Sequence, residues 1–251
     1  MTEKRDLVSY AEQYESLPFE PTQAHYRRKL ILSQIEQVRP IRLLEIGCGQ
    51  LPLFTNLPKA MDVTVVEPAE TFFSIAKNLT NGMDNVKVLH GFIETIDLNE
   101  SEFDMIILSC VLHEVSAPST MLKAIRRLCH DKTILHVNVP NAHSLHRQLA
   151  VSMGLIRDPA ERSETQRRMQ QRGTVYCAKS LRDELRSSGF QVFDEGSCFV
   201  KPFTHSQMQA LIESGFMTGA LLDGLDGLAK RLPDIGSEIW ANACIDASWQ
   251  A

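Results

Sequence analysis

The segment that most constrains this chain is residues 43–49, where a short apolar strand containing Glu45 runs into Gly47 and Gly49. Glycines at the end of a strand allow a tight turn and let a ligand approach main-chain N–H groups closely. A second apolar strand ends at Glu67, 18 positions after Gly49. An acid at that place in a βαβ unit can accept hydrogen bonds from both ribose hydroxyls. The pattern therefore predicts an α/β fold that binds an adenosine-containing small molecule.

Position 52 distinguishes between two classes of ligand. A dinucleotide-binding fingerprint has a third glycine three places after the second, where the helix packs under a pyrophosphate. This chain has Pro52 there. Proline suits the first turn of a helix, but it offers no N–H group to a phosphate. The sequence therefore favours a ligand without phosphates over NAD(P).

Glu45, Gly47 and Gly49 resemble the first motif of the class I S-adenosylmethionine-dependent methyltransferases. The resemblance implies an α/β fold with a doubly wound, mostly parallel seven-stranded sheet and S-adenosylmethionine as cofactor. It implies that Glu45 orders the glycine loop or contacts the ligand amine through water, and that Glu67 holds the ribose. The cofactor-binding residues expected around the first two strands are Glu45, Gly47, Cys48, Gly49, Glu67 and Pro68.

The composition fits one domain with a helical insertion, since 251 residues with 43% hydrophobic content can bury a sizeable core. We expect a single ligand-binding domain over residues 1–251, with N-terminal helices over 1–39 and a helical cover over 140–178. Residues 1–20 are expected to form a short helical lid over the ligand.

Composition also limits the partners and the compartment. No apolar run approaches the ~20 residues of a membrane span, and the first residues do not resemble a signal peptide, so we expect a cytoplasmic protein. The net charge of −5 gives no electrostatic footprint for nucleic acid. The six cysteines are scattered without a C-x-x-C pair, which implies neither a disulfide framework nor a metal site.

Apolar periodicity predicts strands that alternate with helices along the first part of the chain. The expected strands are residues 42–46, 63–67, 86–89, 103–108, 133–139, 191–194, 197–200 and 238–245. The expected helices are residues 23–38 with Thr22 as cap, 71–79, 121–129, 141–153, 159–172, 180–189, 206–214 and 218–231.

The loops after the third and fourth strands supply further ligand contacts. Relatives commonly have Gly-Asp after the third strand, whereas this chain has Gly91-Phe92. We therefore expect Phe92 and Ile93 to sandwich the adenine, with packing of Phe92 in the core as the alternative. In the resembling family, the first residues after the fourth strand, here Ser109 and Cys110, touch the amino acid part of the ligand through backbone carbonyls.

Candidates for the chemistry follow the fourth and fifth strands. His113 or Glu114 could act as a base, or could cap the next helix. Residues 139–147, 153–156, 175–176 and 199–203 resemble a subgroup of small-molecule and sugar methyltransferases in which a helical cover lies over the acceptor pocket. In that subgroup His143, His146 and Arg147 would face a polar or anionic substrate.

Aromatic residues complete the expected pocket. The resemblance places Tyr176 near the sulfonium, where an aromatic face attracts a cation; packing under the cover helix is the alternative. The candidate catalytic residues are Tyr176, His113, His143 and Tyr14.

The sequence leads to one main function and two alternatives. The main expectation is methyl transfer from S-adenosylmethionine to a small molecule, in which proximity and orientation supply most of the rate. One alternative is an enzyme that cyclises S-adenosylmethionine, releasing methylthioadenosine and a small cyclic amino acid such as azetidine-2-carboxylate. The other is a non-catalytic protein that retains the ligand site. The sequence leaves the acceptor and the oligomeric state open, and a homodimer is compatible with it.

Overall fold

The computed structural model describes residue 7 and residues 17–98, 102–162 and 173–249. Seven strands form one sheet in the order β3-β2-β1-β4-β5-β7-β6. Neighbouring strands from β3 to β5 are parallel, and β7 runs antiparallel to both β5 and β6. The strands are β1 Arg42–Ile46, β2 Asp62–Glu67, β3 Val86–His90, β4 Phe103–Ser109, β5 Cys129–Pro140, β6 Phe190–Cys198 and β7 Glu238–Ile245. This confirms the doubly wound, mostly parallel fold.

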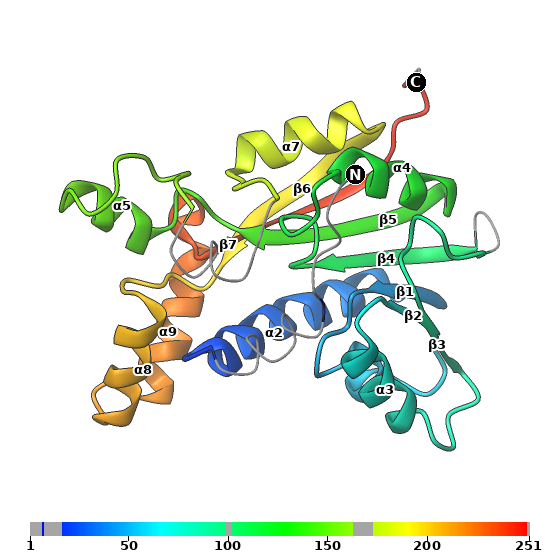
Figure 1. Ribbon diagram of the computed structural model, residues 1–251, viewed down its shortest axis with the longest axis horizontal. Coiled ribbons are helices and arrows are strands. Elements are labelled where there is room, and N and C mark those ends of the chain that lie inside the picture. The colour runs from blue at the N-terminus through cyan, green and yellow to red at the C-terminus, as the bar shows by residue number, and fades with distance from the viewer. Residues whose placement is uncertain (1–6, 8–16, 99–101, 163–172, 250–251) are drawn as a thin grey trace.

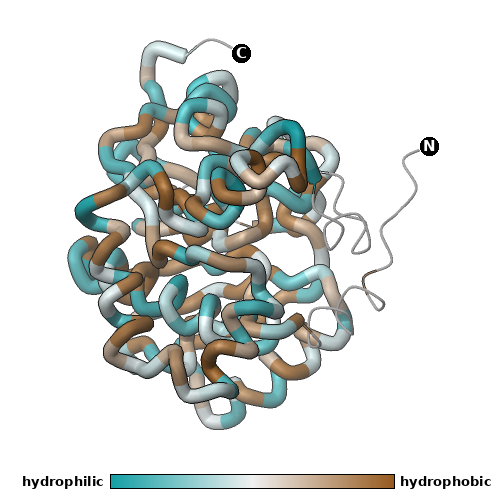
Figure 2. The backbone as a smooth tube through the Cα atoms, turned by 90° about the vertical axis from the view of Figure 1, so that its left-hand side faces the viewer, coloured by the Kyte–Doolittle hydropathy of each residue, from teal (hydrophilic) through white to brown (hydrophobic). Residues whose placement is uncertain are grey.

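Helices cover both faces of the sheet (Figure 1). Helices α4 and α7 lie on one face and α2 and α3 on the other, while α5, α8 and α9 stand beyond one end of the strands. The helices are α2 Glu20–Val38, α3 Glu70–Leu79, α4 Pro118–Arg127, α5 Leu145–Ser152, α7 Ala178–Ser187, α8 His205–Glu213 and α9 Gly219–Ala229, with short 3₁₀ helices η1 Leu53–Asn56 and η2 Pro233–Ile235. Hydrophilic and hydrophobic residues alternate along the outer segments of the tube in Figure 2, as amphipathic elements require.

The central strands are buried on both faces, which explains their continuous apolar sequences. Successive side chains of a strand point to opposite faces. Leu44 and Ile46 therefore belong to the core shared with α4 and α7, and Leu43 belongs to the core shared with α2 and α3. A third cluster fastens α8 and α9 to α2, where Phe199 stacks on Tyr26 with ring centroids 4.8 Å apart. The parallel pairing of β2, β1, β4 and β5 places the carboxyl ends of these strands at one edge of the sheet.

Several element boundaries differ from the sequence prediction. Helix α2 begins at Glu20 after Phe19, whose φ is 63°, so Thr22 lies inside the helix and does not cap it. Helix α5 begins at Leu145, since the preceding Asn141 pairs with Tyr176 in an isolated bridge.

The two short strands expected within residues 191–200 are instead one strand, β6. A register shift between Val192 and Asp194 interrupts its apolar pattern and thus its sequence signal. Most of the helix expected over 159–172 and of the lid expected over 1–20 lies outside the described residues.

Among the described residues, no helix is long and apolar enough to cross a membrane.

A buried histidine in the middle of the sheet makes stability sensitive to acid. His136 is fully buried, and its Nδ1 lies 2.7 Å from Oδ1 of Asn242. Asn242 donates its amide N–H to Gln34, which fixes Oδ1 as an acceptor and makes Nδ1 of His136 the donor. Burial lowers the pKa of His136 to about 4, against the ordinary 6.5. The neutral ring therefore contributes stability above pH 6.5 that is lost as the pH falls toward 4.

We predict that His136→Asn, which retains an amide donor at the Nδ1 position, flattens the fall in unfolding free energy between pH 6.5 and 4 by about 3 kcal/mol. Urea unfolding at several pH values measures the effect. His25→Asn, at an exposed position of α2, should keep the full pH dependence. Parallel curves for wild type and His136→Asn would contradict the prediction.

Candidate functional site

The loop after β1 is built from glycines that no other residue could replace without strain. Gly47 and Gly49 have φ values of 75° and 56°, in the left-handed region. A Cβ at Gly47 would lie 2.6 Å from Cγ2 of Val111, which belongs to the loop after β4. The N–H of Gly47 donates to the carbonyl of Val66, 2.8 Å away. The glycine loop is thus held between the ends of β2 and β4, with its backbone exposed to close approach.

Glu67, at the end of β2, is bonded to this loop. Its carboxylate accepts from the N–H groups of Cys48, Gly49 and Ala69 at 2.9, 3.3 and 2.8 Å. Burial raises the pKa of Glu67, and these three N–H groups oppose that effect. The thiol of Cys48 acts on the same carboxylate and also lowers its pKa. The buried acid therefore connects two loops.

Glu45 supports the glycine loop from below. The side chain is buried within β1 and accepts from the N–H of Leu53 at 2.9 Å. Burial raises the pKa of Glu45 to about 8, although this hydrogen bond and Arg28 lower it. Arg28 also donates to the carbonyl of Pro52 at 2.6 Å, at the start of η1. Glu45 thus joins β1 to the start of η1, and its expected role toward the ligand stays a prediction.

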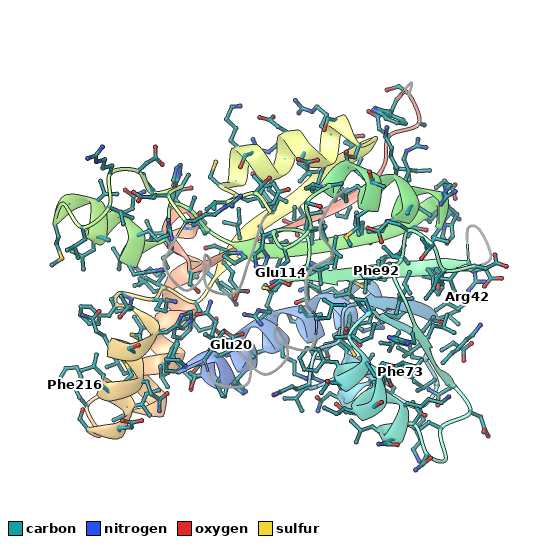
Figure 3. The ribbon with its side chains drawn as sticks, viewed as in Figure 1. Glu20, Arg42, Phe73, Phe92, Glu114 and Phe216 are labelled. Atoms are coloured by element: carbon teal, nitrogen blue, oxygen red, sulfur yellow. The ribbon has the colours of Figure 1, made fainter. Side chains whose placement is uncertain are left out.

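The loops after β3 and β4 present different surfaces. Phe92, on the loop after β3, is 47% exposed, whereas the adjacent Ile93 is buried in the core (Figure 3). Cys110 follows Ser109 at the end of β4 with a φ of 53° and donates its N–H to the carbonyl of Asn138. Pro68, directly after β2, has no N–H group, and its carbonyl oxygen lies 3.1 Å from Nε2 of His90. The structure thus separates Phe92 from Ile93, and only Phe92 is open to a ligand's face.

Three of the four candidate catalytic residues belong to the described part of the chain, and their surroundings differ. Tyr176 is 1% exposed and packs in the core, and its carbonyl accepts from the N–H of Ala142. His143 is exposed, and its N–H donates to Oδ1 of Asn141. His113 is buried after β4, with Nε2 3.7 Å from Oε1 of Glu114. Tyr14 lies outside the described residues.

The cover segment lies directly on the loop after β4. A Cβ at Gly173 would lie 1.9 Å from the carbonyl oxygen of His113, so only glycine fits this contact. Arg147 donates from its guanidinium to the carbonyls of Pro159 and Glu161, which ties α5 to the start of the cover. The two described parts of the expected cover, residues 140–162 and 173–178, therefore both make defined contacts.

A buried polar network that the motifs did not predict lies beside these loops. Glu238 begins β7 and accepts from Arg27, Gln23 and Asn138, with nearest distances of 2.6, 2.8 and 3.0 Å. Burial alone would raise the pKa of Glu238, but its partners, Arg27 foremost, hold it below the usual value. Nδ2 of Asn138 also lies 3.4 Å from Sγ of Cys110. The spacing of Gln23 and Arg27 on one face of α2 was the sequence signal for this network.

We predict that Glu45→Gln is tolerated and that Glu45→Ala is not. Glutamine retains an oxygen for the N–H of Leu53, whereas alanine leaves this buried donor unpaired and should cost about 1–3 kcal/mol of unfolding free energy. The raised pKa means that the folded wild type holds a proton, so its stability falls as the pH rises from 4.5 to 8.

Urea unfolding at pH 6 and pH 9 tests both parts. Glu45→Gln should lose less stability between the two pH values than wild type, while Glu36→Gln, at an exposed position of α2, should behave as wild type. An unchanged pH dependence in Glu45→Gln would show that Glu45 is ionised throughout.

Comparisons with known proteins agree with this geometry. The family model of a methyltransferase domain matches residues 22–195. No curated protein matches the sequence. An S-adenosylmethionine-dependent methyltransferase from Aquifex aeolicus superposes with a TM-score of 0.59 at 15% identity, covering 96% of this chain and 100% of the other.

Two further solved structures share the fold. The N-methyltransferase NodS from Bradyrhizobium japonicum, in complex with S-adenosylhomocysteine, gives a TM-score of 0.58 at 12% identity, with 96% of this chain and 99% of NodS covered. The [4+2]-cyclase SpnF gives 0.56 at 16% identity, with 87% and 80% covered. At these identities the likeness shows the fold, while the family model matches well over half of the chain. The chain therefore belongs to the family described by this methyltransferase domain.

Proposed function

We propose that this enzyme transfers the methyl group of S-adenosylmethionine to a small molecule that binds beside the ends of β4 and β5. The observation that carries the proposal is the contact of Glu67 with the N–H groups of Cys48 and Gly49. It fixes a buried carboxylate next to a glycine turn in which a side chain at Gly47 would clash with Val111. Such a cradle fits a ribose and the adjoining methionine chain of the cofactor.

The proposed contacts follow the loops in order. Glu67 and Pro68 would lie along the ribose, and Gly47, Cys48 and Gly49 along the methionine part. Phe92 would cover one face of the adenine, with Ile93 supporting that loop from the core in place of the expected sandwich. Ser109 and Cys110 would present carbonyls to the amino acid end.

The chemistry requires little from the protein's side chains. The sulfonium supplies an activated methyl group, so holding the acceptor in line gives most of the rate. A base is needed when the acceptor must lose a proton. Buried beside Glu114, His113 is the candidate for that base, whereas His143 is exposed. Tyr176, in its core position, would support the cover segment and not face the sulfonium; Tyr14 remains a candidate of the lid.

A cyclising reaction on S-adenosylmethionine is the second candidate. The observation in its favour is that a structure described as a [4+2]-cyclase shares this fold, so the fold itself does not determine the reaction. In such an enzyme the cofactor's own amine would attack its carbon chain, releasing methylthioadenosine. The network at Glu238, which extends the polar edge beyond Cys110, favours a separate acceptor instead.

We predict that Glu67→Ala weakens S-adenosylhomocysteine binding by about 1–3 kcal/mol, the range for losing charge-assisted hydrogen bonds. Isothermal titration calorimetry measures the affinity, with Glu70→Ala, an acid three residues further at the start of α3, as control. Because Glu67 also holds loop N–H groups, Glu67→Gln should be included, since it keeps one acceptor and separates loop support from ribose binding. Unchanged affinity in all variants would place the ribose elsewhere.

Product analysis distinguishes the two candidate reactions. We expect that purified enzyme incubated with S-adenosylmethionine alone leaves it intact, and that NADH gives no thermal stabilisation. Mass spectrometry of the mixture measures the fate of S-adenosylmethionine, and a thermal melt measures the effect of NADH. Enzyme-dependent methylthioadenosine without any acceptor would overturn methyl transfer in favour of cyclisation.

A further inference from the structure

Lys201, three residues after the end of β6, is a buried cation without a carboxylate partner among the described residues. Its side chain is 3% exposed, and its one hydrogen-bonding contact in the described part of the chain is Nε2 of His205 at 3.1 Å. Glu20 and Glu238 are the acids that favour its charge, yet Arg27 forms ion pairs with both. Burial lowers the pKa of Lys201 to about 8. At neutral pH the ammonium is therefore mostly charged while its counter-ions are shared.

The other groups around Lys201 are basic. They are His146 and Arg147 on α5 and His205 on α8. The charge of Arg147 lowers the pKa of Lys201, and the charge of Lys201 lowers the pKa of both histidines. Burial, then the charge of Lys201, lowers the pKa of His146 to about 2 and that of His205 to about 3. Both rings are therefore neutral at pH 7, and each carries one N–H donor. Nδ1 of His146 is buried and has no partner among the described residues.

This cluster of Lys201, His146 and His205 lies at the same edge of the sheet as the cofactor loops. Cys198 ends β6 opposite Glu238, and Glu238 is bonded to Asn138. Asn138 in turn contacts Cys110, after β4. Glu20, labelled in Figure 3, lies at the start of α2, which packs against α8 and α9. A molecule that reached from Cys110 across Asn138 and Glu238 would meet Lys201.

A buried ammonium group is costly unless an anion accompanies it. Neutral histidines, the cations Arg27 and Arg147, and acids that are shared with Arg27 surround this buried lysine. It is therefore matched to a negative charge that the described residues do not supply. We propose that Lys201, with His146 and His205, binds an anionic group of the methyl acceptor, a carboxylate or a phosphate. The ammonium supplies charge, and Nδ1–H of His146 supplies a neutral donor. This assignment rests on the proposed methyl transfer and names the class of its substrate.

The test uses Lys201→Met, which removes the charge but fills most of the volume. Acetate and phosphate are the probes, each compared with chloride at equal ionic strength, at pH 7 and with saturating S-adenosylhomocysteine. In wild type, acetate or phosphate should raise the melting temperature, and the anion that does so identifies the acceptor's group. Lys201→Met should bind this anion at least about tenfold more weakly, because charge-assisted hydrogen bonds are the stronger ones. Lys179→Met, whose side chain is 81% exposed, should respond as wild type.

Nuclear magnetic resonance of wild type labelled at the lysine ε-carbon gives a readout that needs no variant to fold. One lysine should titrate near pH 8, against the ordinary 10.5 of a lysine, and the stabilising anion should shift that titration upward. Absence of any acetate or phosphate response in wild type, or an equal response in Lys201→Met, overturns the proposal.

Calorimetry with S-adenosylhomocysteine separates the remaining cases. Equal affinity in wild type and Lys201→Met supports an acceptor site. A loss of affinity in Lys201→Met assigns Lys201 to the carboxylate of the cofactor and overturns the acceptor proposal. Wild type that binds no S-adenosylhomocysteine would refute the proposed function, and the response to acetate or phosphate in its absence would still report on Lys201 as an anion site.

Discussion

The carboxylate of Glu67 is the interaction on which the ligand edge of the sheet depends. It accepts N–H groups from the glycine loop after β1 and from the start of the segment leading to α3. Parallel strands bring their carboxyl ends together, but the loops that follow must still satisfy their backbone donors. One buried acid does this for two loops at once. The arrangement holds the glycine turn in a ligand-accepting shape at the cost of burying a charge.

The sequence predicts this half of the molecule well because its signals are local. Apolar runs fix β1 and β4, and the acid and glycines around Gly47 lie within a few residues of their strand. The starts of α2 and α5 differ from the sequence prediction, since Phe19 in a left-handed conformation and the bridge at Asn141 replace ordinary caps. Such exceptions depend on packing with distant segments and carry no local signal.

The polar half of the site could not be predicted in the same way. Arg27, Asn138 and Glu238 come from three elements separated by about 100 residues each, and only the insertion of β7 between β5 and β6 brings them together. In the sequence, Lys201 is a single lysine between two short apolar stretches, and nothing there indicates that it is buried. Its burial follows from α8 packing on α2, which is a property of the assembled fold. Chemistry that depends on long-range placement is thus hidden from periodicity and motif spacing.

The position of β7 has a consequence for biosynthesis. This strand is among the last parts of the described chain to be made, yet it pairs with both β5 and β6 and carries Glu238. Until it leaves the ribosome, β6 lacks its neighbour, and Arg27 and Asn138 lack their common acceptor. The half of the sheet from β3 to β5 can form earlier, because its pairings involve only preceding segments. During co-translational folding the glycine loop and Glu67 would therefore be in place before the network at Glu238.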